Sequence, residues 1–129
     1  MTIKKCLFGI LIALLLLTVH AEAADWLNYV EGKGGALLYV DMESLRTTSA
    51  GTIRILKKVE PSGSSGIGSI LSEIEMDCRN SMIRYLKETT KFSDGTSDSV
   101  SKNEEFRKVT LEDDDESLME LVCSLKRSN

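Results

Sequence analysis

The sequence predicts an α+β domain in which an antiparallel meander of about five or six strands packs against one C-terminal helix and is held by one disulfide. Residues 52–60 and 70–78 alternate apolar and polar side chains, the two-residue period of a strand with one buried face. Residues 113–126 change to the spacing of an amphipathic helix. One cysteine falls in each kind of segment, Cys78 in the strand and Cys123 in the helix. A sheet covered by a single helix accounts for all three observations.

Residues 1–23 have the pattern of a secretory signal peptide. Two lysines precede an apolar run over residues 7–17, and an Ala-x-Ala site follows that ends at Ala23. The run is shorter than the roughly 20 apolar residues of a membrane-spanning helix, so cleavage is favoured over a retained anchor. Cys6 precedes the run, which argues against a lipid-anchor cysteine. We expect a single exported domain at residues 24–129, periplasmic, secreted or at the cell surface, with no membrane span after cleavage.

Charge and composition exclude several classes of function. The whole chain has a net charge of −4, and loss of the signal peptide leaves 14 basic and 19 acidic side chains. A net-acidic domain is unsuited to nucleic acid, whose binding depends on neutralising phosphates with Lys and Arg. His20 is the one histidine and leaves with the signal peptide, which excludes the usual Ser-His-Asp and Cys-His catalytic arrangements.

The first two strands are expected at residues 25–30 and 36–41, on either side of the glycine-rich turn EGKGG. Residues 42–51, MESLRTTSAG, are expected to form a turn or a short helical connector. The third strand, residues 52–60, places its aliphatic side chains on one face and Arg54 and Lys58 on the other.

A Pro/Gly/Ser loop over residues 61–69 leads into the fourth strand, residues 70–78, where Cys78 is in phase with the aliphatic side chains that face the core. A fifth strand is expected at residues 82–92. The polar segment 93–105 is expected to be mobile.

Residues 106–111 are expected to form a last short strand before the helix at residues 113–126. Asp113 and Glu116 fit a capping box, and acidic side chains in the first turn suit the positive end of a helix. The apolar stripe of this helix consists of Leu118, Leu121, Val122 and Leu125.

A structural disulfide is the simplest interpretation of Cys78 and Cys123, because an exported domain meets an oxidising compartment and has a small core. The loop that it would close spans 46 residues, for which the chain-entropy estimate is about 4 kcal/mol. The alternatives are a metal-binding or redox-active thiol pair. A metal site would need further ligands, and a redox pair is usually a C-x-x-C motif, which the sequence lacks.

Glu73, Glu75 and Asp77 of the fourth strand are the candidates for acid–base chemistry. They alternate onto the face away from the core, opposite Lys and Arg, so a solvated, cross-strand-paired surface is favoured over catalysis. The acidic run 112–116 does not follow the EF-hand pattern, and the glycines of residues 61–69 lack the lysine and helix of a phosphate-binding loop. We expect no catalytic residue, no metal site and no cofactor.

A partner-binding face is expected on the side of the sheet that the helix leaves open. The residues predicted to bind the partner are Arg54, Lys58, Arg84 and Lys87. Further basic residues expected on this face are Lys57, Arg79 and Lys91. The alternative is an ordinary solvated face with long side chains. Four aromatic residues are either anchors on this face or part of the core: Trp26, Tyr29, Tyr39 and Tyr85.

The order of several short motifs resembles the surface-adhesin protein E family of small exported bacterial proteins. The motifs are "DW" at the mature start, "LLYVDMESLR", "TIRILKKVE" before a proline, "SEIEMDC" followed by "RYL", and "SLMELVC". The resemblance covers most of the mature chain and implies an antiparallel sheet, a C-terminal helix and a disulfide between Cys78 and Cys123. It also implies adhesion, because the named member of the family is an outer-surface adhesin that binds host matrix and serum proteins.

We therefore predict a non-enzymatic exported binding module, adhesin-like, that presents its open sheet face to a protein or small-molecule partner. A protein partner would be an extracellular-matrix or envelope protein. The alternative is a periplasmic structural or envelope accessory protein without an adhesive role.

Overall fold

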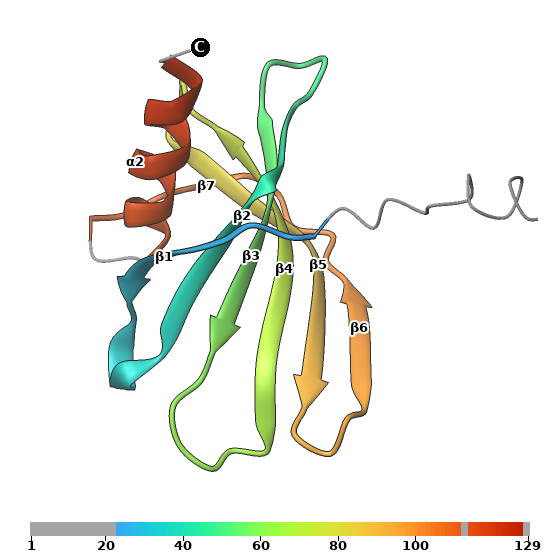
Figure 1. Ribbon diagram of the computed structural model, residues 1–129. Helices are drawn as coiled ribbons and strands as arrows, with labels where there is room; N and C mark the ends of the chain where they lie inside the picture. The colour runs from blue at the N-terminus through green and yellow to red at the C-terminus, as the bar shows by residue number, and fades with distance from the viewer. Residues whose placement is uncertain (1–22, 112–113, 128–129) are drawn as a thin grey trace, which may run out of the picture.

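The computed structural model describes residues 23–111 and 114–127 and shows one twisted sheet with one helix packed on it (Figure 1). The six main strands are neighbours in space in the same order as in the chain, each antiparallel to the next. They are β1 (Trp26–Glu31), β2 (Leu37–Thr47), β3 (Ile53–Glu60), β4 (Ile67–Asp77), β5 (Met82–Phe92) and β6 (Ser97–Ser101). A two-residue strand, β7 (Arg107–Lys108), pairs with the other end of β5, and the helix α2 (Asp114–Arg127) follows. The predicted α+β meander with one C-terminal helix is confirmed.

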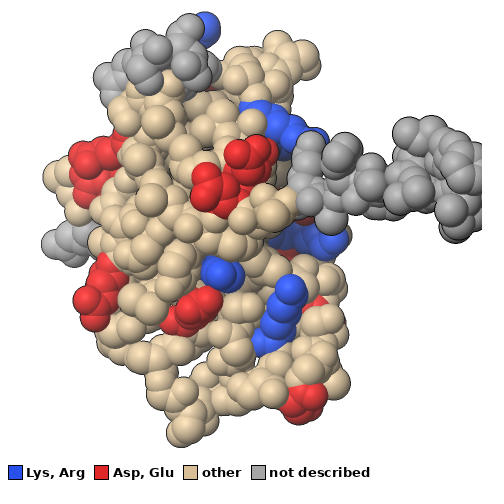
Figure 2. Space-filling model, in the orientation of Figure 1, with Lys and Arg blue, Asp and Glu red and all other residues tan. Residues whose placement is uncertain are grey.

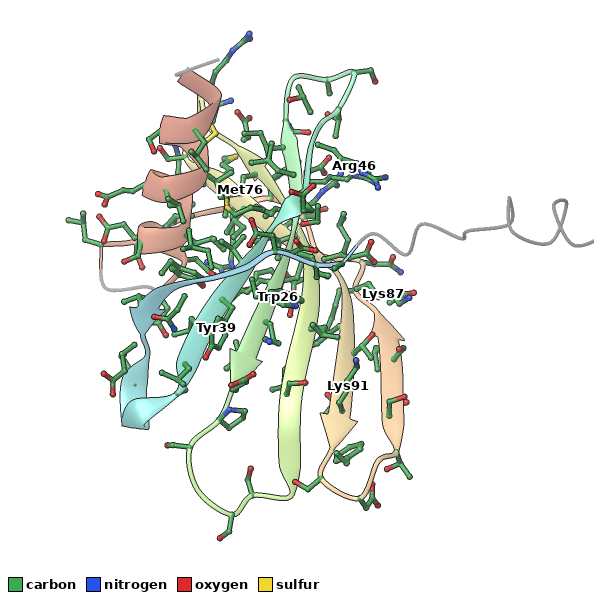
Figure 3. All side chains as sticks on the ribbon, viewed as in Figure 1. Trp26, Tyr39, Arg46, Met76, Lys87 and Lys91 are labelled. Atoms are coloured by element: carbon green, nitrogen blue, oxygen red, sulfur yellow. A yellow bond between two sulfur atoms is a disulfide. The ribbon has the colours of Figure 1, made fainter. Side chains whose placement is uncertain are left out.

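The core lies between α2 and one face of the sheet. Residues that pair directly across an antiparallel ladder point to the same face, so Ile53 with Met76 and Ile55 with Ile74 form two adjacent core pairs. Leu118 of α2 packs against them and is fully buried, and Figure 3 places Met76 next to the helix. Full burial of such a side chain contributes about 1.5–3 kcal/mol. The helix-covered face therefore supplies most of the apolar stabilisation.

A disulfide joins Cys78, directly after β4, to Cys123 of α2, with an S–S distance of 2.10 Å and a Cα–Cα distance of 5.8 Å. Cys123 is 9% exposed and belongs to the core cluster, and Cys78 is half-buried at its edge. The bond ties the helix to the sheet that it covers. The predicted pairing is confirmed.

Strand β2 is longer than predicted, and the prediction of a connector over residues 42–51 was wrong for its first half. The strand continues to Thr47 through an irregularity in its pairing with β3, between Asp41 and Arg46. Ser44 stabilises this irregularity because its hydroxyl donates to the Asp41 carbonyl at 2.7 Å and accepts the Leu56 N–H at 2.8 Å. The side-chain hydroxyl takes the place of a ladder hydrogen bond, so a Ser/Thr-rich stretch remains in the sheet.

The polar segment 93–105 also contains more regular structure than predicted. Its residues Ser97–Ser101 form β6, which pairs with β5 in register from Lys91↔Ser97 to Lys87↔Ser101. All five residues of β6 are exposed. Backbone hydrogen bonds with β5 form this strand without any apolar alternation, which is why the sequence did not indicate it.

Two predictions fall outside the described residues, namely the signal peptide over residues 1–23, of which only Ala23 is described, and the proposed cap Asp113. The described helix begins at Asp114, and its first turn contains Asp115 and Glu116, which is favourable at the positive end of a helix dipole. Within the described ranges, no helix is long and apolar enough to cross a membrane.

Candidate functional site

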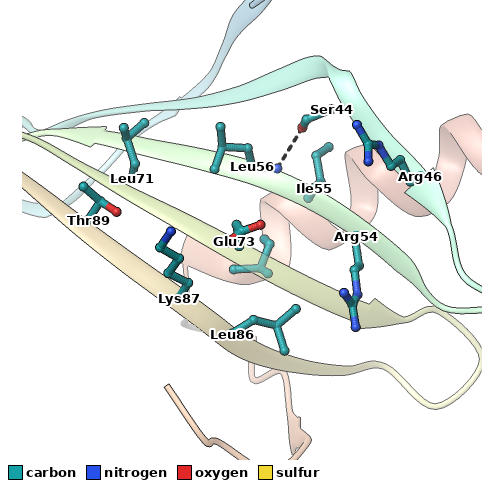
Figure 4. Close-up of a pocket in the computed structure, with 11 residues that line it drawn as sticks. Ser44, Arg46, Arg54, Ile55, Leu56, Leu71, Glu73, Leu86, Lys87 and Thr89 are labelled. Carbon is teal, nitrogen blue, oxygen red and sulfur yellow. Dashed lines mark hydrogen bonds between the residues drawn. The ribbon is translucent and has the colours of Figure 1, made fainter. Parts of the chain in front are cut away.

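The side of strands β1 to β5 that lies away from α2, called the open face below, carries a cavity of about 450 Å³ (Figure 4). Strands β2, β3, β4 and β5 all contribute to its walls. In Figure 4 the helix lies behind the sheet, while the cavity side chains of Arg54, Leu71 and Lys87 stand in front of it. The charged residues that line it are Arg46, Arg54, Glu73 and Lys87.

All four predicted binding residues lie on the open face, but only two of them line the cavity. Arg54 pairs across the ladder with Glu75, and Glu75 pairs with Arg84, so these three side chains share the open face. Of the four, Arg54 and Lys87 belong to the cavity lining, while Lys58 and Arg84 lie outside it. Their binding role remains a prediction.

Arg84 is engaged in an ion pair within the sheet. Its Nη2 and Nε lie 2.5 Å and 2.7 Å from Glu75 Oε2, and its guanidinium lies 4.4 Å from the centre of the Phe106 ring. Thr52 donates to Glu75 Oε1 at 3.0 Å, and Arg54 Nε is 3.5 Å from the same oxygen. Burial raises the pKa of Glu75, but the hydrogen bonds from Arg84 and Thr52 outweigh it and leave that pKa below its ordinary value. The charge of Arg84 therefore stabilises the sheet through its ion pair with Glu75.

Glu73 is solvated as expected, whereas Glu75 has the expected cross-strand arginine partners but is buried. Glu73 is exposed, whereas Glu75 is 4% exposed because its two arginine neighbours cover it. Asp77 instead supports the turn after β4, where its carboxylate accepts hydrogen bonds from the backbone of Arg79 and the side chain of Asn80.

Lys58 is held by two aromatic rings on the open face. Its Nζ lies 4.5 Å from the ring centre of Trp26 and 4.7 Å from that of Tyr39, and 3.2 Å from Glu60 Oε1. Cation–π contacts of this kind contribute roughly 0.5–2 kcal/mol. Trp26 and Tyr39 are labelled in Figure 3. Because Trp26 and Tyr39 contact Lys58, they lie on the open face, as predicted for anchors. Each ring, however, already contacts the Lys58 ammonium of the same chain.

Lys57 was wrongly expected on the open face. It lies on the helix side of β3 with its side chain 7% exposed, and its Nζ is 3.0 Å from Asp115 Oδ1 in the first turn of α2. Asp115 also accepts hydrogen bonds from Tyr85 at 2.8 Å and from Arg107 at 2.8 Å. Burial raises the pKa of Asp115, but the Lys57 charge and these hydrogen bonds outweigh it and hold that pKa below its ordinary value.

Tyr29 and Tyr85 lie on the helix side of the sheet, beside this buried ion pair. Both pack against the core cluster, so they belong to the core and are not open-face anchors. The Tyr29 hydroxyl is buried and has no hydrogen-bond partner among the described residues, and burial raises its pKa.

The two remaining basic residues of the predicted set lie away from the cavity. Arg79 lines a second cavity, of about 740 Å³, beside the disulfide. Lys91 is exposed near the far end of β5 and lines neither cavity (Figure 3).

Arg46 is the cavity residue that the sequence did not reveal. It is exposed on β2 and pairs directly with Arg54 of β3, so two basic residues lie opposite each other in the ladder. Its place depends on the irregularity of β2, which shifts the register between Asp41 and Arg46. Since residues 42–51 were expected to form a connector, no sequence signal assigned Arg46 to a face of the sheet.

Aliphatic side chains form the rest of the cavity, among them Leu56, Leu71 and Leu86. Leu86 lies at a bulge, because Glu73 pairs with Lys87 while the next residue, Ile74, pairs with Tyr85. The extra residue places a leucine in the cavity wall beside a lysine. The combination of guanidinium, ammonium and aliphatic groups suits the non-covalent binding of an anionic group attached to an apolar body.

On the face that Figure 2 shows, basic and acidic side chains of the described residues are interspersed and form no continuous basic patch. Over the described part of the chain, no group of three His, Cys, Asp or Glu side chains is arranged to hold a metal ion.

A family model described as surface-adhesin protein E matches residues 26–124. The matched span runs from the first residue of β1 to the residue after Cys123, so it contains the whole sheet, the disulfide and the open-face cavity. A search of curated proteins and a search of solved structures each gave no match.

Proposed function

The chain belongs to the surface-adhesin protein E family, and from this premise we propose that it is an exported, non-enzymatic binding module that holds a protein partner on its open face. The observation that supports this proposal is the cavity of about 450 Å³ on the one face of the sheet that α2 does not cover.

The charges of the cavity favour a binding role over a purely structural one. Among the described residues, Arg46 and Lys87 take part in no ion pair, whereas Lys58 and Arg84 are paired within the fold. A volume of this size falls within the range of about 300–1,000 Å³ that is usual for ligand sites. Exposed, unpaired cations beside leucines are available to a partner.

Membership of a surface-adhesin family implies an exported or cell-surface protein. We propose in addition that residues 1–23 are removed and that residues 24–129 form the working domain. Mass spectrometry of the exported protein tests this: a mature N-terminus at Ala24 supports it, and a chain that still carries residues 1–23 contradicts it.

The proposed binding face is tested with the exported protein, disulfide intact, immobilised and exposed to purified extracellular-matrix proteins and, separately, to envelope proteins. The variant Arg54→Glu/Lys87→Glu reverses two cavity charges. The variant Arg79→Glu/Lys91→Glu makes the same change in net charge away from the cavity and serves as the matched control.

We expect the cavity variant to reduce capture of a matrix protein at least tenfold and the control to leave it within twofold, with both variants keeping the far-UV circular dichroism of the parent. Equal capture by both variants would remove the open face as the binding site. Capture of envelope proteins alone would support the accessory role in place of adhesion.

A further inference from the structure

We propose that the open-face cavity recognises a carboxylate and an apolar side chain two residues apart, presented on one side of an extended acidic segment of the partner protein. Arg46 and Arg54 would hold the carboxylate, and the leucines of the cavity would contact the apolar side chain. This inference rests on the proposed function and names the chemistry of its partner.

The first argument is the pairing of Arg46 with Arg54. Like charges directly opposite each other on one face of a sheet are destabilising, and these two residues are direct partners in the β2–β3 ladder. Glu75 offsets this repulsion only in part, since its Oε1 is 3.5 Å from Arg54 while its Oε2 is 2.5 Å from Arg84. A bound anion between the two guanidinium groups would relieve the repulsion.

The second argument is the shape of the guanidinium group. Its planar donors match a carboxylate in a two-point geometry, which a lysine ammonium does not provide. The cavity has two arginines on adjacent strands at this position, with Lys87 of β5 as a third cation. The donor set therefore fits a carboxylate or a phosphate, and Glu73 in the cavity lining favours the singly charged carboxylate.

The third argument is the distribution of side chains along the cavity. Figure 4 places Arg46 and Arg54 at one end and Leu71 and Thr89 at the other, with Leu56 between them. A ligand with a charged head and an apolar neighbour can contact both ends at once. An extended peptide with an acidic and an apolar residue two positions apart has this form, because such residues point to the same side of the chain.

The charges around the cavity argue against a polyanion. Glu73 lies within the cavity lining, and the whole chain has a net charge of −4. Acidic side chains are interspersed with basic ones on the surface that Figure 2 shows. A sulfated polysaccharide would meet repulsion beyond the two arginines, whereas a peptide with one or two carboxylates would not.

The test uses two fluorescein-labelled hexapeptides with blocked termini: one has serine at every second position and glutamate, leucine and glutamate between the serines, and the other has glutamine in place of both glutamates. In the extended chain the carboxylates and the leucine of the first peptide point to the same side. Binding of both peptides to the exported protein is measured by fluorescence anisotropy at low salt. We expect the glutamate peptide to bind at least tenfold more tightly than the glutamine peptide. Equal binding of the two peptides, or no binding of either at 1 mM protein (on the order of the weakest specific affinities), overturns the inference.

Three variants identify the site. Arg46→Gln is expected to weaken binding of the glutamate peptide at least tenfold, and Leu71→Ser about threefold. Lys91→Gln, on the same strand as Lys87, is expected to leave the affinity for this peptide unchanged. Arg46→Gln is also expected to keep or raise the urea midpoint, because it removes a repulsion. A lowered midpoint together with lost binding would indicate a structural role for Arg46 and would contradict the inference.

Two further outcomes separate this inference from the proposed function. A heparin fragment that binds more tightly than the glutamate peptide, and through Arg46, would replace the peptide with a polyanion and overturn the inference alone. If Arg46→Gln leaves capture of a matrix protein unchanged while Arg54→Glu/Lys87→Glu abolishes it, the open face still binds its partner and only the carboxylate assignment fails.

Discussion

Replacing Asp115 with asparagine is expected to produce one of the largest losses of stability available in this domain. The substitution keeps the shape of the side chain and removes its charge, which leaves the Lys57 ammonium buried with its side chain 7% exposed. Removing one partner of a buried ion pair typically costs about 3–5 kcal/mol, because the remaining charge is left without compensation. That loss is a large share of the roughly 5–15 kcal/mol by which a domain is stable.

Lys57→Met is expected to cost less, about 1.5–3 kcal/mol, the range for a hydrogen bond to a charged group. The Asp115 carboxylate then still accepts hydrogen bonds from Tyr85 at 2.8 Å and from Arg107 at 2.8 Å. The double variant Lys57→Met/Asp115→Asn is expected to cost less than the sum of the two single variants, by roughly 0.5–3 kcal/mol, since the two residues are in direct contact.

Urea unfolding at pH 7 with the disulfide intact measures these free energies. The fluorescence of Trp26, the one tryptophan of the chain, and far-UV circular dichroism follow the transition independently. Asp98→Asn, on the exposed strand β6, is the control and is expected to change stability by less than about 0.5 kcal/mol. If Asp115→Asn lowers the free energy of unfolding by less than about 1 kcal/mol, which is below the usual range for breaking a buried ion pair, the Lys57–Asp115 pair does not stabilise the fold as argued. The same conclusion follows if the losses of the two single variants add up to the loss of the double variant.

Three further predictions concern the fold. In the folded protein the pKa values of Asp115 and Glu75 lie below their ordinary values of 3.8 and 4.5. The stability that these two carboxylates contribute is therefore complete above pH 4.5 and is lost as the pH falls through their folded pKa values. Asp115→Asn should make the free energy of unfolding, measured in urea, fall less steeply with decreasing pH, and an unchanged slope would refute this prediction. Cys78→Ser/Cys123→Ser should lower the free energy of unfolding by up to about 4 kcal/mol. If reducing the disulfide of the parent protein leaves its free energy of unfolding unchanged, this prediction is wrong. Ile74→Val should cost about 0.5–1.5 kcal/mol because the side chain is 0% exposed, and a neutral effect in thermal denaturation would contradict its core placement.

Much of the architecture followed from local patterns. The alternation in β3 and β4 and the helical spacing near the C-terminus reflect which side chains can be buried together, so they can be read from the sequence. The two cysteines could be paired because an exported domain with a small core meets an oxidising compartment, and the bond between Cys78 and Cys123 confirms the pairing.

The errors have a common physical origin in long-range contacts. Lys57 falls in phase with the buried residues of β3, but a lysine at a core position is stable only beside a partner, and its partner Asp115 is 58 residues away in the sequence. Strand β6 and the second half of β2 lack apolar alternation, so only their pairing with a neighbouring strand identifies them as strands.

The sequence by itself determined which apolar residues of β3, β4 and the C-terminal helix face the core, because hydrophobic burial depends on the periodicity of side chains along the chain. It also indicated the disulfide, because an exported domain meets an oxidising compartment. Only the tertiary structure decided which of the many basic residues on the sheet are paired and which are available. Arg84 and Lys58 are neutralised by neighbours, while Arg46 comes to face Arg54 through a register shift in β2. Register and ion pairing are set by contacts between strands, so they are absent from any single stretch of sequence.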